Sequence, residues 1–284
     1  MNRIKTPKKV DIILFTYNRA MQADLALRSI RDMFDNVDKV IVFYKHSDIA
    51  TFGLGYGKLW DKVWKGEYGF PIETAYQYEF GRDFKEIYKR LTADYYTGFC
   101  DDDVFVKKTN CDSILEKLNE PDVSAISLKI HAKQTNSYPG VDTPLPNFIE
   151  TEPYLKWNWR KYHRYDVDWG YPTNVNAMIF PRQYFSDLIM PNTFKCPNSM
   201  EGSLNVVRNK FKDCLVSFKE TRVLNIAANL VQTNNKTPEI TTHLYTIEDL
   251  NRRFLDGEII STENIYNKEV TWTSTELEYK FKRS

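Results

Sequence analysis

The 284-residue sequence lacks several features that would assign it to a class directly. It has no apolar run approaching the ~20 residues that span a bilayer. It also has no apolar amino-terminal segment of the kind that directs secretion. Its four cysteines show no Cys-x-x-Cys spacing, which would indicate a zinc or redox site. We therefore expect a cytoplasmic protein without an integral membrane segment, and the sequence leaves peripheral attachment to a membrane open.

An excess of charge of one sign is also missing. The 39 basic and 38 acidic residues leave a net charge of +1, so no global field attracts nucleic acid or an anionic membrane. Aromatic side chains, by contrast, make up 14% of the residues. They pack protein cores and also line ligand grooves. This composition predicts an ordinary globular protein with one large core.

The most informative stretch is an apolar run, Tyr95–Cys100, that leads into three consecutive acids, Asp101, Asp102 and Asp103. Adjacent carboxylates repel one another, and Mg²⁺ or Mn²⁺, which prefer oxygen ligands, would relieve that repulsion. In an extended chain Asp101 and Asp103 would face one way and Asp102 the other. The pattern predicts a metal site for a diphosphate, and the alternative is a plain acidic turn between strands.

The amino-terminal part of the chain predicts a βαβ unit. Val10–Phe15 and Val40–Tyr44 are apolar runs of strand length, and residues 20–34 between them have helical spacing of apolar side chains. Strands joined in this way are expected to be parallel, and ligands of such sheets bind beyond the carboxyl ends of the strands. The later strand Tyr95–Cys100 would then bring the acidic triplet to the same edge as Thr16–Arg19.

The rest of the chain is less regular. Residues 51–69 predict an irregular or partly helical connection, and residues 131–165 a long binding loop or lid. A turn over Cys196–Gly202 opens a predicted helix around 203–212, which puts Glu201 near the start of that helix. Further helices are expected at 82–91, 112–118, 183–189 and 245–255, the last capped by Thr246, and further strands at 123–130 and 223–227. Residues 178–180 form a short apolar run.

Two motifs together resemble a known family. Ile13–Arg19 and the strand that ends in Asp101–Asp103, about 85 residues apart, resemble nucleotide-sugar-dependent glycosyltransferases of the GT-A fold, family-two-like. The second half is similar to a bacterial and phage branch of this family. The resemblance implies an α/β fold with a Rossmann-like, mostly parallel central sheet flanked by helices. It also implies a single domain, 1–284, in which residues 1–130 bind the donor and 131–284 form an acceptor-binding half with a helical tail.

The implied activity is metal-dependent transfer of a sugar from a nucleotide-sugar donor, expected to be UDP-linked, to a glycan or other hydroxyl acceptor. A bound Mn²⁺ or Mg²⁺ would stabilise the charge that develops on the leaving diphosphate. The resemblance implies donor contacts from Thr16, Tyr17, Arg19, Arg82, Asp101 and Asp102, and metal ligation by Asp101 and Asp103, with His243 a candidate ligand by its order in the chain alone.

One departure from the family pattern leaves the donor open. The second strand of the family usually ends in Asp-Asp-Gly-Ser, whereas Tyr44-Lys45-His46-Ser47-Asp48 stands in its place here. The acid that contacts the base is therefore absent or has moved to Asp48.

An inverting transfer needs a carboxylate within reach of the acceptor hydroxyl. Glu201 is the preferred candidate, with Asp168 and then Asp166 as alternatives, and a retaining enzyme would need none of them as base. Acceptor contacts are expected from Trp157, Trp159, Trp169 and Asn176, although each tryptophan would serve equally well in a core.

Two other functions stay open. The basic and aromatic run from Trp157 to Arg164 would suit hydroxymethylated DNA as the acceptor, because it offers both phosphate contacts and stacking. The missing acid after the second strand would suit a non-catalytic module that binds a nucleotide or sugar.

Overall fold

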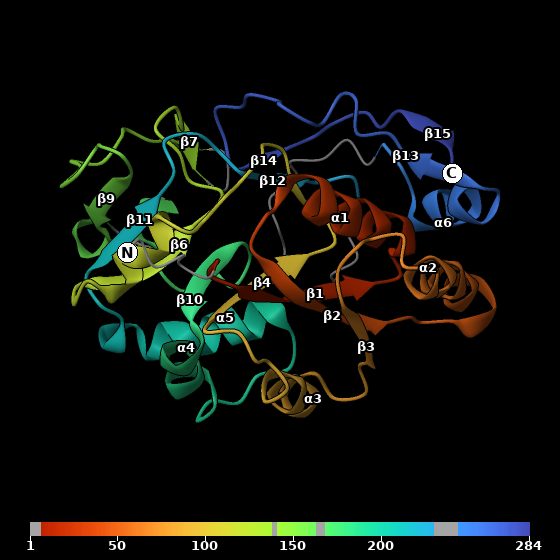
Figure 1. Ribbon diagram of the computed structural model, residues 1–284, viewed down its shortest axis with the longest axis horizontal. Coiled ribbons are helices and arrows are strands. Elements are labelled where there is room, and N and C mark those ends of the chain that lie inside the picture. Colours follow the sequence, from red (N-terminus) through yellow and green to blue (C-terminus); the bar gives the residue numbers. More distant parts are fainter. Residues whose placement is uncertain (1–6, 138–140, 163–167, 230–243) are drawn as a thin grey trace, which may run out of the picture.

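The structure, a computed structural model, describes residues 7–137, 141–162, 168–229 and 244–284. Within these residues an eight-stranded sheet crosses the molecule (Figure 1). Two of its strands, β9 and β10, run against the other six. The predicted α/β fold with a mostly parallel central sheet is therefore confirmed. In spatial order the strands are β3 (Ile72–Tyr76), β2 (Val37–Lys45), β1 (Val10–Tyr17), β4 (Tyr95–Cys100), β10 (Met178–Pro181), β6 (Val123–Ser127), β11 (Cys214–Ser217) and β9 (Leu155–Asn158).

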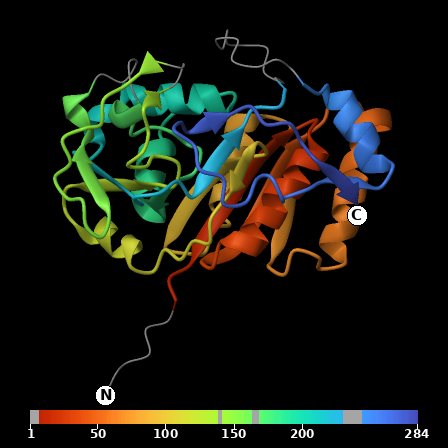
Figure 2. The same cartoon turned by 90° about the horizontal axis from the view of Figure 1, so that it is seen from above.

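Helices cover both faces of this sheet (Figures 1 and 2). One face carries α1 (Ala20–Met33), α2 (Leu54–Trp64) and α6 (Ile247–Leu255), and the other carries α3 (Phe80–Tyr88), α4 (Arg182–Ile189) and α5 (Pro197–Val206). Short helical turns are η1 (Ile49–Gly53), η2 (Ile114–Asn119), η3 (Trp159–Lys161), η4 (Asp168–Gly170) and η5 (Arg208–Lys210). No helix in these ranges is long and apolar enough to cross a membrane.

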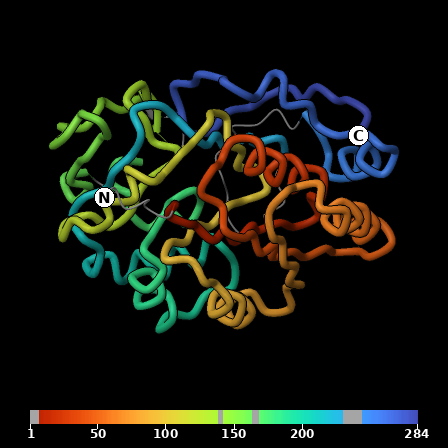
Figure 3. The backbone as a smooth tube through the Cα atoms, in the orientation of Figure 1, coloured from red at the N-terminus to blue at the C-terminus, as the bar shows by residue number. Residues whose placement is uncertain are grey.

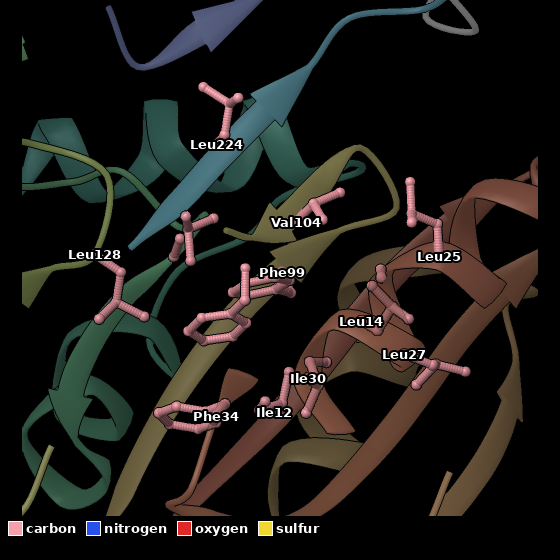
Figure 4. Packing of buried hydrophobic residues seen from close by; sticks show 14 of the residues in the cluster. Ile12, Leu14, Leu25, Leu27, Ile30, Phe34, Phe99, Val104, Leu128 and Leu224 are labelled. Atoms are coloured by element: carbon pink, nitrogen blue, oxygen red, sulfur yellow. The ribbon is translucent and has the colours of Figure 1, made fainter. Parts of the chain in front are cut away.

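Strand β1 shows why the central sequence run is apolar at every position. Ile12 and Leu14 point into the core beneath α1, whereas Ile13 and Phe15 point into the core on the other face. Side chains alternate along a strand, so a sheet covered on both faces needs apolar residues at each position. Figure 4 shows part of the first core, where side chains of β1, α1, β4, β5 and β12 pack together.

A small second sheet lies against the end of β4. Its order is β14 (Ser274–Thr275), β12 (Val223–Ile226) and β5 (Asp103–Phe105), and Asn225 of β12 stands opposite Asp103 of β5. The C-terminal part of the chain crosses the molecule to reach this sheet and then returns to the side of α6 (Figure 3). Two antiparallel pairs of short strands complete the fold, β7 (Asn136–Ser137) with β8 (Val141–Asp142) and β13 (Glu258–Ile260) with β15 (Phe281–Arg283).

Several predicted elements differ from the structure. Strands β3, β9, β10 and β11 of the large sheet were not predicted, and β9 lies inside the stretch expected to be an irregular loop. Each has only four or five residues, too few for periodicity to identify. The strand predicted at 223–227 belongs to the small sheet, and that at 123–130 ends at Ser127. The predicted helix near 112–118 is the 3₁₀ turn η2.

The predicted C-terminal helix is present with its predicted cap. Thr246 Oγ1 accepts a hydrogen bond of 3.0 Å from the backbone N–H of Asp249 at the start of α6. Such a cap satisfies one of the free N–H groups of the first turn. The boundary of this helix was therefore readable from local sequence.

Candidate functional site

The candidate site lies at the sheet edge where β1 and β4 end. These strands pair in parallel with Phe15 opposite Cys100, so the residues that follow them emerge side by side. Arg19 Nη1 lies 3.0 Å from Asp101 Oδ1 and 3.3 Å from Asp102 Oδ2. The structure thus joins the two motifs that the sequence placed about 85 residues apart.

The acidic triplet forms a turn, and the predicted alternation of its side chains is wrong. Asp101 and Asp102 occupy a turn between β4 and β5, and both face Arg19. Asn225 Nδ2 donates to Asp102 Oδ1 at 2.9 Å and to Asp103 Oδ1 at 3.2 Å. Asp103 Oδ2 also accepts a hydrogen bond from the backbone N–H of Cys100. The rule for extended chains does not apply because the strand has already ended at Cys100.

Burial controls the ionisation of these acids. Asp101 is 4% exposed and Asp103 is fully buried. Burial raises the pKa of Asp101 to about 6, against the opposing charge of Arg19. Burial likewise raises the pKa of Asp103, against the opposing charge of Lys129. Burial alone would lower the pKa of Arg19, but Asp101 and Asp102 outweigh it and raise that pKa.

Arg19 is fixed on several sides. Its Nε donates to Asn229 Oδ1 at 2.8 Å, and its Nη2 donates to the Asn229 carbonyl oxygen. Its backbone N–H donates to the hydroxyl of Tyr56, which also lies 2.8 Å from Thr16 Oγ1. Predicted donor residues Thr16 and Arg19 therefore belong to one buried network with the acids, and Tyr17 is the half-buried last residue of β1.

The loop after β1 is tied to the loop after β2. Asn18 adopts a left-handed conformation, with φ of 58°, which Asn tolerates better than most residues. Its amide group exchanges two hydrogen bonds of 2.9 Å with Ser47, one to the hydroxyl and one from the backbone N–H. This pair sets the position of Arg19 relative to the end of β2.

Two predicted donor residues lie outside this network. The Asp48 carboxylate accepts backbone N–H groups of Ala50 and Thr51 and caps the turn η1. Hydrogen bonds from Thr51 and Ala50 lower its pKa. The exposed Arg82 side chain pairs with Asp83 of its own helix at 2.9 Å.

Glu201 occupies the middle of α5, so its predicted place near the helix start is wrong. Pro197 takes the first helical position, where its missing N–H costs nothing. Ser199 Oγ accepts the backbone N–H of Cys196 at 2.9 Å and closes the first turn. The stretch interpreted as a turn is therefore the first turn of the helix itself.

The carboxylate of Glu201 is held by two donors, and the residue is partly buried. Oε1 accepts the backbone N–H of Val175 at 3.0 Å, and Oε2 accepts the hydroxyl of Tyr171 at 3.1 Å. Burial raises the pKa of Glu201, while Val175, Lys129 and Tyr171 oppose that rise and Asp103 adds to it. Glu201 is therefore an electrostatic neighbour of the acidic turn.

Lys129 is a site residue that sequence reasoning missed. Its Nζ lies 3.7 Å from Asp103 Oδ1, and the residue is only 9% exposed. It follows the end of β6, a strand that runs parallel to β11 and the majority of the sheet. A lysine within an apolar strand-like run was the available signal, because lysine is seldom buried unless it is paired.

The donor atoms suit a hard divalent cation. Cys100 Sγ and carboxylate oxygens of Asp102 and Asp103 lie within 4.8 Å of one another. Burial raises the pKa of the Cys100 thiol well above its usual value, so the thiol stays protonated and donates to Asn176 Oδ1 at 3.0 Å. The oxygens that remain match the preference of Mn²⁺ and Mg²⁺. The structure thus offers Asp102 with Asp103, whereas the sequence predicted Asp101 with Asp103.

The prediction that three tryptophans stack on the acceptor is wrong for this structure. Trp157, Trp159 and Trp169 are at most 1% exposed. The rings of Trp157 and Trp169 pack edge to face at 5.2 Å, and Trp157 Nε1 donates to the Trp169 carbonyl oxygen. These side chains fill the core because burial of large aromatic rings stabilises the folded state.

The other predicted site residues are placed as follows. Asn176 lies beside Cys100 next to the acidic turn. The Asp168 carboxylate accepts hydrogen bonds from Gln134 at 2.7 Å and Thr273 at 3.4 Å, near the C-terminal segment. His243 and Asp166 lie outside the described residues.

A cavity of about 450 Å³ lies elsewhere in the described part of the chain. Its lining includes Lys9 and Val37, at the starts of β1 and β2, so it opens at the amino-terminal edge of these strands. None of the predicted site residues lines it. The chemistry-bearing residues are instead at the carboxyl edge, where open α/β sheets bind their ligands.

Comparison with known proteins gives similarity in solved structures alone. No family model and no curated protein matches the chain. S. aureus TarS is 14% identical with a TM-score of 0.47, and the match covers 74% of this chain and 35% of that one. TarS 1-349 in complex with UDP-GlcNAc is 13% identical with a TM-score of 0.47, covering 74% of this chain and 56% of that one.

A third similar structure is the mannosyltransferase PcManGT from Pyrobaculum calidifontis in complex with GDP-Man and Mn²⁺. It is 14% identical with a TM-score of 0.35, and the match covers 45% of this chain and 37% of that one. The chain thus spans between 35% and 56% of the length of these structures. The likeness concerns the path of the backbone, so the function has to be argued from the residues of the site.

Proposed function

We propose that this chain is a glycosyltransferase that moves a sugar from a nucleotide-sugar donor to a hydroxyl acceptor, with a divalent cation held by Asp102 and Asp103. The observation that carries this proposal is the cluster of acids at the carboxyl edge of a mostly parallel sheet, with a further, partly buried acid, Glu201, as its electrostatic neighbour. The motif resemblance of Ile13–Arg19 and the acidic triplet supports the same reaction class.

On the donor side, the acids would hold the divalent cation, and Arg19 would contact the diphosphate. A divalent cation, when bound, supplies positive charge that stabilises the leaving diphosphate. Asp102 and Asp103 would hold it, and Asn225 keeps their carboxylates together through its shared amide. Arg19, released in part from the acids by that added charge, would face the diphosphate oxygens. Its guanidinium forms paired hydrogen bonds to phosphate readily.

On the acceptor side, Glu201 is the proposed general base. A base works best when its pKa approaches the working pH, and burial raises the pKa of Glu201 in that direction. Tyr171 and the Val175 N–H fix the carboxylate in one orientation. Glu201 would accept the proton of the acceptor hydroxyl while that oxygen attacks the sugar.

Hydroxymethylated DNA is not proposed as the acceptor. That hypothesis required bases to stack on Trp157 and Trp159, and both side chains are buried in the structure. Arg160, from the same run, pairs with Asp213 of the chain. The two tryptophans of this run are therefore not available for stacking on bases.

The test is a binding and transfer experiment with four variants. Wild-type protein is titrated with UDP, UDP-GlcNAc and GDP-Man, with and without Mn²⁺, and thermal stability is followed, because a ligand of the folded state raises it. We expect a shift that needs Mn²⁺. Asp102→Asn and Asp103→Asn should lose that shift, and Asp61→Asn, an exposed acid on α2, should keep it.

Glu201→Gln separates chemistry from binding. It should keep the Mn²⁺-dependent shift and lower the rate of sugar transfer or donor hydrolysis by roughly 10²- to 10⁴-fold, the range of general base catalysis. Binding by the wild type without hydrolysis or transfer would instead favour a non-catalytic nucleotide-binding module. No binding of any nucleotide would contradict the proposal.

A further inference from the structure

Lys129 holds a charged group at a fixed place in the site. Its backbone N–H and that of Ile130 donate to Ser127 Oγ, at 3.4 and 3.2 Å. Its carbonyl oxygen accepts the hydroxyl of Thr221 at 3.1 Å. These contacts tie the residue to the end of β6, and its side chain is buried against the acidic turn.

The ammonium of Lys129 has donors left over. Among the described residues its Nζ makes one ion pair, to Asp103 at 3.7 Å, and no hydrogen bond. That distance exceeds the roughly 3.2 Å limit of a good N–H···O bond. An ammonium carries three N–H donors, and an ion pair at 3.7 Å leaves them available to a ligand. The group is therefore arranged to meet a ligand oxygen.

Other buried lysines of the chain are paired differently. Lys156, 7% exposed, donates to Glu120 at 2.6 Å and to Asp122 at 3.1 Å. Lys62, 6% exposed, lies 2.5 Å from Asp24. Their ammonium groups contact carboxylates at hydrogen-bond distance, as structural lysines do. Lys129 is held near its acid without such a bond.

The neighbours of Lys129 belong to both halves of the proposed reaction. Asp103 is a proposed holder of the cation at the diphosphate, and Glu201 is the proposed base at the acceptor hydroxyl. Burial would lower the pKa of Lys129, but both carboxylates, together with that of Asp102, outweigh burial and raise it. The group that lies between a leaving diphosphate and an attacking hydroxyl is the glycosyl group that is transferred.

We propose that the Lys129 ammonium donates hydrogen bonds to hydroxyl oxygens of the transferred sugar, and that Lys129 is thus a sugar-recognition residue. This inference rests on the proposed function, because it takes the donor to be a nucleotide sugar. It assigns Lys129 to the glycosyl part of the donor rather than to the diphosphate.

The test compares a nucleotide sugar with its own nucleoside diphosphate. Wild-type protein and Lys129→Met are titrated by calorimetry with UDP and UDP-GlcNAc, and with GDP and GDP-Man, all with Mn²⁺. For the pair that the wild type binds, we expect Kd for the nucleotide sugar to rise roughly 10- to 100-fold, as for the loss of a charged hydrogen bond. Kd for the matching diphosphate should change less than about twofold, because the diphosphate lacks the sugar that Lys129 is proposed to contact.

Lys156→Met is the matched control, because it removes a buried ammonium away from the site and should leave both Kd values unchanged. An equal rise for UDP and UDP-GlcNAc would assign Lys129 to the diphosphate or to the acids, and no rise would make it purely structural; each outcome overturns the inference. Wild-type protein that binds no nucleotide would contradict the proposed function itself. If Lys129→Met does not fold, Lys129→Gln replaces it in the same titrations. The ¹⁵N resonance of the wild-type ammonium gives an independent test, because it should shift when UDP-GlcNAc binds and stay unchanged when UDP binds.

Discussion

At the scale of the residue, the charge balance of the site depends on Arg19. It contacts two of the three acids and is 7% exposed, so it acts as an internal counter-ion of the acidic turn. A divalent cation at Asp102 and Asp103 would supply charge to the same carboxylates. We therefore expect a bound cation to replace part of the positive charge that is lost when Arg19 is substituted.

Arg19→Met should destabilise the protein by about 3–5 kcal/mol, because it leaves buried acids without their partner. Mn²⁺ should restore part of that loss and should stabilise the variant more than the wild type. Urea denaturation with and without Mn²⁺ measures both effects. Arg28→Met, which removes a buried partner of Asp24 elsewhere, is the control and should show no such rescue. Equal effects of Mn²⁺ on the two variants would contradict the expectation.

At the scale of the element, the reversed strand β10 brings the acceptor-side residues to the acids. The chain just before β10 crosses β4 closely, since a Cβ built on Gly98 would lie 2.3 Å from the Val175 carbonyl oxygen. Ala177, with φ of 54°, donates its N–H to the Gly98 carbonyl oxygen at 2.7 Å. This crossing places Val175 beside Glu201 and Asn176 beside Cys100.

Gly98→Ala should cost about 1–3 kcal/mol of stability, as overpacking in a core does, and should also reduce transfer by displacing Val175 from Glu201. Gly202→Ala, on α5 next to Glu201, is the contrasting substitution, because a Cβ added there would meet no other atom within 4 Å and would cause no clash. That variant should be stabilised by up to about 1 kcal/mol through helix propensity. Chemical denaturation measures both, and a neutral Gly98→Ala would show that the crossing can widen freely.

At the scale of the whole molecule, a buried ion network ties distant segments together. Asp24 of α1, with no exposure, lies 2.8 Å from Arg28 Nε and 2.5 Å from Lys62 Nζ of α2. Arg28 Nη2 donates in turn to the Ile260 carbonyl oxygen at the end of β13. The C-terminal segment is thereby fixed to the helix that follows β1.

Asp24→Asn should destabilise the whole fold at pH 7 by about 3–5 kcal/mol, because it removes the carboxylate closest to two buried cations and leaves Lys62 with Glu67 alone, at 3.8 Å. Burial would raise the pKa of Asp24, but Arg28 and Lys62 outweigh it and lower that pKa. Its contribution is therefore complete above the unfolded value of about 3.9 and lost as the pH falls through the lower folded value. Urea denaturation at pH 7 and below pH 4 should show that the difference in free energy of unfolding between the variant and wild type becomes smaller at the lower pH. Asp61→Asn on α2 should stay within about 0.5 kcal/mol.

The sequence by itself determined the elements whose pattern is long and local. The strands β1 and β4, the helix α1 and the capped helix α6 follow from periodicity and a cap, and the meeting of Arg19 with the acidic triplet follows from the rule for parallel strands. Because these strands are apolar on both faces, they have to lie inside a sheet that helices cover on both sides. The reaction class could be suggested on the same residues.

The tertiary structure decided which side chains share the site. Asn225 joins Asp102 and Asp103 across more than 120 residues, and Lys129 and Glu201 reach the acids from separate elements. Core packing also buries the three tryptophans that the sequence suggested for ligand contacts. A local pattern cannot supply these contacts, because each depends on how chain segments distant in sequence fill one core and neutralise one another's charge.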